Sequence, residues 1–173
     1  MKRLTLTFGL LLTFLAGSAF ADGWQGSIGY TQLSDDDEGI DVSLGAVTGS
    51  VSYRFDNSEN FAIIPEFRLG FGLSDDTITA FATRFDVKIK TFYGFTVRGE
   101  YAFNESVYVF AQPTYANLDI EVSSGGISAS EDEWEFGFGG GVGFNVGERG
   151  SIEVFIEDFD GTLAVTGAYR HRF

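Results

Sequence analysis

The sequence predicts an all-β protein, an eight-stranded antiparallel up-and-down transmembrane β-barrel. Segments of about ten residues alternate large apolar residues with polar residues or glycine, and polar turns separate the segments. Glycine (23), phenylalanine (19) and aromatic residues (16%) are abundant, whereas cysteine is absent, so no disulfide can form. After residue 21 no apolar stretch is long enough to cross a bilayer as a helix. A closed barrel also gives every backbone N–H and C=O in hydrocarbon a partner.

Residues 1–21 are expected to be a cleaved signal peptide, and residues 22–173 to form the barrel. Lys2 and Arg3 precede an apolar run at residues 4–15, and Ala19 and Ala21 match the small-x-small cleavage pattern. The alternative, an uncleaved anchor, is weaker because the run is short and ends in small residues.

The first two strands are expected at residues 24–32 and 40–55, joined by an acidic loop at 34–39. In the first strand Trp24, Ile28 and Tyr30 share one face. In the second strand the apolar phase moves from even positions to odd positions, which a β-bulge near Gly49 would explain.

The third strand, residues 61–73, has the clearest pattern, with large apolar residues facing lipid and Glu66 and Arg68 facing the lumen. The fourth, residues 91–103, places Arg98 and Glu100 inward. Residues 74–90 continue to alternate, so this hairpin is expected to project beyond the bilayer.

The remaining strands are expected at residues 107–120, 134–146, 151–157 and 162–173, with a Ser/Gly loop at 123–130. Tyr108 and Phe110 are placed inward, because the opposite choice would put polar side chains in lipid. If Val107 lies opposite Phe144, antiparallel pairing sets these two rings opposite inward glycines, Tyr108 on Gly143 and Phe110 on Gly141.

Long connections alternate with short turns at 56–60, 104–105 and 147–150, which is the arrangement of outer-membrane barrels, with short turns in the periplasm. A soluble β-sandwich also alternates. It is disfavoured because aromatic residues gather at the strand ends beside the short turns, as an interfacial girdle requires. The expected location is therefore the outer membrane.

The end of the chain reads Leu163-x-Val165-x-Gly167-x-Tyr169-x-His171-x-Phe173. With the signal peptide and eight strands, this segment resembles the small outer-membrane β-barrel family of OmpA-type transmembrane domains and OmpX/Ail-like porin-family proteins. The resemblance implies that Val165, Tyr169 and Phe173 form a C-terminal signal for the outer-membrane assembly machinery; His171 stands where an aromatic or aliphatic residue is usual. It also implies a structural barrel, a small-solute pore or a surface-contact protein.

Charged residues on the inward faces are the main candidate site. They could line a selective pore or form a paired network that fills the lumen, and the narrow interior of an eight-stranded barrel favours the network. If Phe61 and Phe103 lie opposite each other, Glu66 faces Arg98 across neighbouring strands. The set is Glu66, Arg68, Arg98, Glu100, Glu153, Arg170 and Arg172.

No enzyme, cofactor or metal site is expected. The single histidine, His171, is near the end of the chain on the expected lipid face, so a lipid-modifying enzyme ranks a distant third. The net charge of −14 disfavours nucleic acid as a partner. The acidic loops are taken as solvated; divalent cations or a surface partner are the alternatives, although residues 35–39 lack the spacing of an EF-hand loop.

The sequence therefore predicts a structural or surface-interaction barrel with a largely occluded polar lumen, in contact with outer-membrane lipid and lipopolysaccharide. A narrow diffusion pore is the alternative function.

Overall fold

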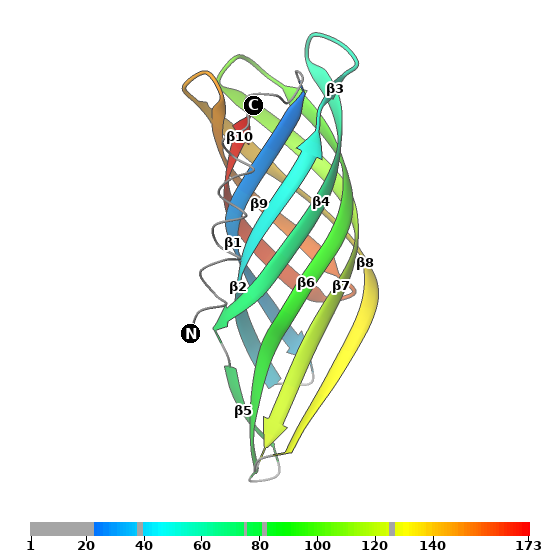
Figure 1. Cartoon of the computed structure of the whole chain (residues 1–173), viewed down its shortest axis with the longest axis vertical. Coiled ribbons are helices and arrows are strands. Elements are labelled where there is room, and N and C mark those ends of the chain that lie inside the picture. Colours follow the sequence, from blue (N-terminus) through cyan, green and yellow to red (C-terminus); the bar gives the residue numbers. More distant parts are fainter. Residues whose placement is uncertain (1–22, 38–39, 75, 81–82, 125–126) are drawn as a thin grey trace, which may run out of the picture.

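A computed structural model describes residues 23–37, 40–74, 76–80, 83–124 and 127–173; the expected signal peptide, residues 1–21, lies outside them. The described chain winds into one antiparallel sheet in which β4 also pairs with β6, so the sheet closes on itself (Figure 1). The strands are β1 (Trp24–Asp37), β2 (Ile40–Tyr53), β3 (Phe55–Asp56), β4 (Phe61–Ser74), β5 (Asp76–Ala80), β6 (Thr83–Ala102), β7 (Val107–Ser124), β8 (Ile127–Val146), β9 (Gly150–Phe159) and β10 (Thr162–Arg172).

Eight long strands form the barrel wall in the order β1, β2, β4, β6, β7, β8, β9 and β10, which confirms the predicted fold class. Two short strands were not predicted as separate elements. β3 pairs with the start of β4 after a break at Arg54. β5 pairs with the first residues of β6, which lie beyond the barrel. Within the described ranges no helix is long and apolar enough to span a membrane.

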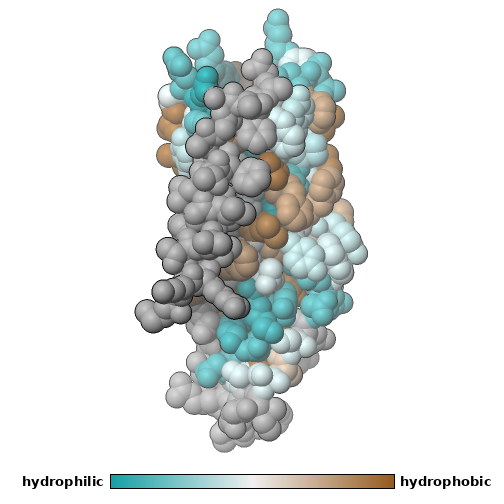
Figure 2. All heavy atoms as spheres, in the orientation of Figure 1, coloured by the Kyte–Doolittle hydropathy of each residue, from teal (hydrophilic) through white to brown (hydrophobic). Residues whose placement is uncertain are grey.

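The two faces of the wall differ in chemistry as the alternation predicts. Outward side chains are large and exposed, such as Phe136 (64%) on β8, whereas Arg98 on β6 points inward and is fully buried. The predicted inward facing of Tyr108 and Phe110 on β7 is confirmed, since both are buried. Figure 2 shows hydrophobic side chains gathered between two hydrophilic zones of one face.

The two ends of the barrel also differ. The end with short turns carries the loops after β3, β6 and β8, whereas at the other end three strands run far past their neighbours (Figure 1). β6 and β8 have 20 residues each and β9 only 10, so residues 127–136 of β8 pair with β7 alone. A tilted membrane strand needs about 9–11 residues, so the extension reaches well past a bilayer.

The projecting hairpin expected at residues 74–90 is therefore confirmed as β5 and the start of β6. Two expected loops are shorter than predicted, because strand pairing continues through their polar residues. β1 and β2 pair as far as Asp37 and Ile40, and β7 and β8 pair as far as Ser124 and Ile127. Polar residues alone therefore do not show where a strand ends, because polar segments can continue to pair within the sheet.

The β-bulge predicted near Gly49 is wrong. β2 pairs with β1 without interruption, and the irregularity lies between Gly45 and Ala46, where β2 meets β4. The apolar phase moves because Leu44 and Ala46 point inward, into an apolar cluster at the extended end of the lumen. The strand keeps its phase while the lumen changes from polar to apolar.

The predicted pairing of Glu66 with Arg98 is also wrong. Phe61 lies opposite Tyr101 rather than Phe103, so Glu66 faces Thr96 and Arg98 faces Ile64. Aromatic ends share a level in the membrane, but tilted strands are staggered, so residues at one level are not in register.

The predicted register between β7 and β8 is confirmed. Val107 lies opposite Phe144, Tyr108 opposite Gly143, and Phe110 opposite Gly141.

Candidate functional site

The lumen holds a set of ion pairs between side chains from different parts of the wall. Six members come from the inward charges expected from sequence, and two, Arg54 and Glu157, were missed. The alternation of β9 contained the signal for Glu157, which follows Glu153 at the same phase. The members are Arg54, Arg68, Arg98, Arg170, Glu66, Glu100, Glu153 and Glu157.

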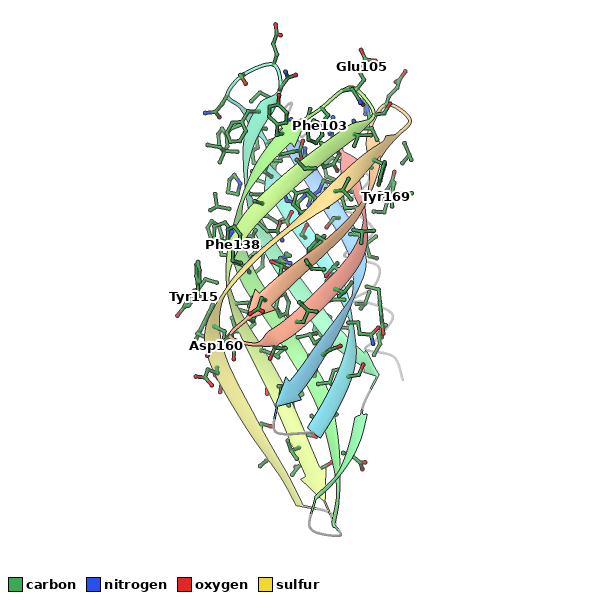
Figure 3. All side chains as sticks on the ribbon, turned by 180° about the vertical axis from the view of Figure 1, so that it is seen from behind. Phe103, Glu105, Tyr115, Phe138, Asp160 and Tyr169 are labelled. Atoms are coloured by element: carbon green, nitrogen blue, oxygen red, sulfur yellow. The ribbon has the colours of Figure 1, made fainter. Side chains whose placement is uncertain are left out.

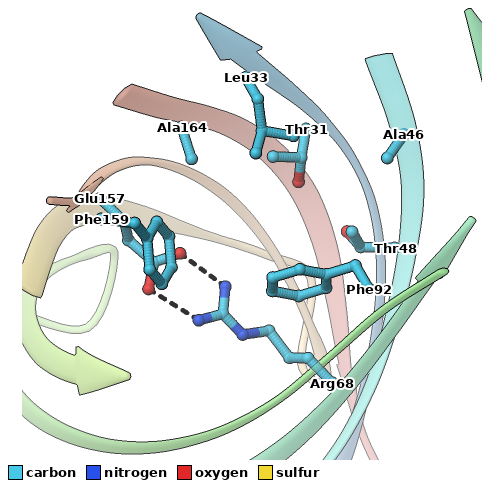
Figure 4. Close-up of a pocket in the computed structure, with 9 residues that line it drawn as sticks. All are labelled: Thr31, Leu33, Ala46, Thr48, Arg68, Phe92, Glu157, Phe159 and Ala164. Carbon is cyan, nitrogen blue, oxygen red and sulfur yellow. Dashed lines mark hydrogen bonds and ion pairs between the residues drawn. The ribbon is translucent and has the colours of Figure 1, made fainter. Parts of the chain in front are cut away.

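One ion pair crosses the full width of the barrel. Arg68 on β4 and Glu157 on β9 lie on strands that are four places apart in a ring of eight. The guanidinium donates from Nη1 to Oε2 at 2.6 Å and from Nη2 to Oε1 at 2.7 Å, a bidentate pair (Figure 4). The hydroxyls of Thr96 and Thr114 lie 2.9 Å from Nη2. The pair therefore ties opposite walls together through the middle of the lumen.

A second group of charges lies nearer the short-turn end. Glu153 on β9 accepts from Arg98 on β6 at 2.7 Å and from Arg170 on β10 at 2.9 Å. Arg170 also donates to Glu66 on β4 at 2.6 Å. The side chains of Arg98 and Glu153 are both 0% exposed, so these charges are wholly shielded from solvent. Buried charges of this kind are tolerated only when paired.

Aromatic rings fill the space between these charges. The Tyr108 hydroxyl lies 2.8 Å from both Ser151 Oγ and Glu153 Oε1. The Arg98 guanidinium lies 3.8 Å from the centre of the Phe110 ring, a distance at which a cation–π interaction is favourable. The Tyr108 ring occupies the position that a side chain at Gly143 would take. Glycine on β8 thus makes room for an aromatic residue on β7.

The remaining expected charges lie at the short-turn end. Glu100 pairs with Arg54 at 2.5 Å. Arg172 is half-buried, and its Nη2 lies 3.5 Å from Asn145 Oδ1. Arg172 is thus set apart from the central ion pairs.

The extended end of the lumen is apolar. Leu33, Phe92 and Phe159 line both of two small cavities, each of about 20 Å³, and Arg68 and Glu157 line one of them. A volume of this size holds about one water molecule. The buried cluster around them comprises Leu33, Leu44, Ala46, Val87, Ile89, Ala116, Phe159 and Ala164.

The residues of the expected C-terminal signal lie on the outside of β10 and at its end. Val165 and Tyr169 are exposed on the outward face, and Figure 3 shows Tyr169 near the short-turn end. The Phe173 backbone N–H donates to the carbonyl of Trp24 at 3.1 Å, so the last residue closes the seam between β10 and β1. His171 contacts the Phe173 ring edge to face.

The other expected sites are less fully described. The cleavage residues Ala19 and Ala21 lie outside the described residues, as do the side chains of Asp35, Asp36 and Asp37. In the described part of the chain, no group of three or more His, Cys, Asp or Glu side chains could hold a metal ion.

Comparison with known families gives one match over nearly the whole chain. Residues 7–171 match the model of the outer membrane protein beta-barrel domain. No curated protein matches the sequence.

Solved structures of outer-membrane barrels are similar in fold. Ail, the attachment invasion locus protein of Yersinia pestis, solved with the heparin analogue sucrose octasulfate, is 20% identical with a TM-score of 0.61, over 88% of this chain and 100% of that one. Neisserial surface protein A is 12% identical with a TM-score of 0.58, over 87% and 97%. The N-terminal β-barrel domain of OprF from Pseudomonas aeruginosa is 9% identical with a TM-score of 0.55, over 86% and 97%. At these identities the likeness concerns the fold.

Proposed function

Because the chain belongs to the family of outer membrane protein beta-barrel domains, we propose that it is a structural or surface-interaction barrel of the outer membrane whose lumen is occluded. In such barrels the short turns face the periplasm and the longer connections face outward. The short-turn end is therefore assigned to the periplasm, and the extension of β6, β7 and β8 to the cell exterior. The family places the chain in the outer membrane, in contact with its lipids.

The Arg68–Glu157 pair is the observation that carries the occluded lumen. It joins opposite strands at 2.6 Å, and a solute on the barrel axis would have to break it. Breaking a buried ion pair leaves uncompensated charge and costs about 3–5 kcal/mol. Buried rings of Phe110 and Phe155 lie nearby at 5.7 Å between centres, so the space beside the pair is also filled. These features favour a plug over the alternative of a narrow diffusion pore.

The same residues support the proposal of a non-catalytic role. Each buried carboxylate of the central group is held by an arginine, as in the contact between Glu153 and Arg170. The single histidine of the chain, His171, packs on Phe173 at the periplasmic end, away from these carboxylates. We propose that the charges act in stability and that partners bind to the exterior of the barrel. Insertion through the outer-membrane assembly machinery, with Val165, Tyr169 and Phe173 as its signal, is part of this proposal.

Thiol labelling tests the occlusion, because the chain has no cysteine of its own. Thr166→Cys places a thiol in the lumen, where Thr166 is 2% exposed, and Ser58→Cys places one on an exposed periplasmic turn as the control. A small charged thiol reagent is expected to label Ser58→Cys in folded protein and Thr166→Cys only after unfolding. Comparable labelling of both folded variants would contradict an occluded lumen.

A further inference from the structure

The barrel wall is incomplete in the exterior extension, because β9 and β10 are too short to reach it. Their connecting turn lies at Asp160, and Figure 3 shows β8 continuing well past this turn. Residues 127–136 of β8 pair with β7 alone, and on the other side of the opening residues 35–37 of β1 pair with β2 alone. In the described part of the chain, the edge of β8 that faces the opening therefore has no partner strand, and it is open to an added one.

The inner face behind this edge is apolar. Leu118 and Ile120 on β7 pack against the apolar cluster at the extended end of the lumen, yet both stay half-buried. Val122 lies opposite Val87 of that cluster and is 36% exposed. The extension therefore leaves apolar side chains partly uncovered on the side where two strands of the wall are missing.

The edge itself is acidic. Residues 127–136 contain four carboxylates, at positions 131, 132, 133 and 135, and no lysine or arginine. Glu133 lies opposite Leu118 and Glu135 opposite Ala116, so both glutamates belong to the inward face of β8. Glu133 is exposed, and Glu135 lines a small cavity beside Phe159, where β9 ends. The inward side of the edge is thus a row of carboxylates in front of an apolar surface.

The described lysines of the extension lie on the other face of the sheet. Lys88 and Lys90 on β6 both contact Glu121, which faces outward on β7. Lys90 also donates to Ser130 Oγ, on the outward face of β8, at 2.8 Å. Because successive side chains of a strand point to opposite faces, these lysines do not reach the inward carboxylate of Glu133.

We propose that the open edge of β8 binds an extended cationic peptide segment by strand addition, with lysine or arginine at every second position. Main-chain hydrogen bonds continue the sheet, and the side chains of the added strand alternate between its two faces. Those on the inner face lie beside Glu133 and Glu135, where opposite charges are favourable neighbours. The long apolar stems of lysine or arginine cover the exposed parts of Leu118 and Ile120.

A second copy of this chain is a poorer occupant of the edge. Antiparallel pairing of two β8 edges over residues 131–135 would set the carboxylates of one copy beside those of the other, which is destabilising. Inward charges also keep an open edge from pairing with apolar strands. The acidic row therefore selects against these occupants and in favour of a cationic one.

This inference rests on the proposed function only for the orientation that places the edge of β8 outside the cell. A conducting lumen would overturn the occlusion and leave the edge as it is. The two can therefore fail separately.

Peptide binding to the folded barrel in phosphatidylcholine nanodiscs tests the proposal. The probe is a fluorescently labelled ten-residue peptide in which lysine alternates with threonine, and fluorescence anisotropy measures its binding. It should bind with a saturable midpoint that rises with salt concentration. Two control peptides should bind far more weakly. One has glutamate in place of lysine, and the other keeps the lysines but is N-methylated along its backbone, so it retains the charge and cannot pair as a strand.

Charge variants on the two faces of the edge give the decisive comparison. Glu133→Gln should weaken binding of the lysine–threonine peptide by about fivefold, the upper end for a cross-strand pair of opposite charges. Asp132→Asn removes the same charge from the adjacent outward position, and Glu148→Gln removes it from an exposed periplasmic turn, so both should leave the midpoint nearly unchanged.

Three results would overturn the proposal. The lysine–threonine peptide fails to bind, which leaves the acidic row as protection of the edge only. The N-methylated peptide binds equally well, so that charge attraction without strand pairing explains the binding. Asp132→Asn weakens binding as much as Glu133→Gln, so that the inward row has no special part in it.

Discussion

Replacing Arg68 by methionine should destabilise the barrel strongly, because it isolates the carboxylate of Glu157. That carboxylate would lose hydrogen bonds of 2.6 Å and 2.7 Å and keep the bond from Thr114 at 2.6 Å. Glu66 would keep its pair with Arg170 at 2.6 Å, so the damage is local. Leaving one buried charge unpaired costs about 3–5 kcal/mol in free energy of unfolding.

The double variant Arg68→Met with Glu157→Met separates the charge from the packing. With neither charge present, two apolar side chains fill a similar volume, and such replacements are about neutral or stabilising by up to about 4 kcal/mol. Equilibrium unfolding in urea, with the protein refolded into lipid vesicles, measures the double variant and the two single variants, Arg68→Met and Glu157→Met. The reasoning is refuted if the single variant costs less than about 1 kcal/mol, the scale of an exposed pair, or if the double variant costs the sum of both singles.

Three further predictions address packing, assembly and pH. Gly143→Ala should cost about 1–3 kcal/mol of unfolding free energy through overpacking against the Tyr108 ring, whereas Gly167→Ala, with open space around its added methyl, should be close to neutral by the same urea assay. Deleting Phe173 should reduce insertion into the outer membrane while secretion across the inner membrane continues, so normal amounts of heat-modifiable, membrane-embedded protein would contradict the assembly role. Hydrogen bonds from Lys88 and Lys90 hold the pKa of Glu121 below its usual range. The contact of Glu121 with these lysines therefore stabilises the extension at pH values above the ordinary glutamate pKa, and this contribution is lost as the pH falls through the lowered pKa. A carboxyl-carbon NMR titration that gives Glu121 an ordinary glutamate pKa would refute this.

Side-chain facing could be predicted from the sequence wherever one face meets lipid and the other meets charge. Phe67 and Arg68 on β4 show why. If the two exchanged faces, a charge would lie in hydrocarbon and an aromatic ring would lie in a charged lumen. The complementarity of Tyr108 and Gly143 was also predictable, since a narrow lumen must fill the space above a glycine. In these cases the chemistry of neighbouring residues in the sequence is sufficient to predict which way a side chain faces.

Register and strand ends could not be predicted as well, because they depend on the closed barrel. Because tilted strands are staggered, Phe61 lies opposite Tyr101 instead of Phe103, and Glu66 does not lie opposite Arg98. Leu44 and Ala46 are apolar residues that face inward. The alternation pattern assumes a lumen that is polar throughout, so these residues were interpreted as a reversal of the inward and outward faces of the strand.

The partners within the lumen were also beyond the sequence pattern. Strands four places apart in the ring bring Arg68 to Glu157, although the two residues are 89 positions apart in the chain. Alternation shows that a residue faces inward, but only the order of all eight strands shows which residue lies opposite. Six of the eight charged residues in the lumen ion pairs were therefore accessible from sequence, but their pairing was not.

Single-channel recording in planar bilayers tests the occluded lumen most directly. Folded wild-type protein should give no steady unitary current, because the Arg68–Glu157 pair and the rings beside it close the axis. The variant Phe110→Ala, which leaves a cavity beside Arg98, serves as the comparison and should show higher conductance than wild type. A steady, ion-sized current through folded wild-type protein would contradict the account and favour a narrow diffusion pore.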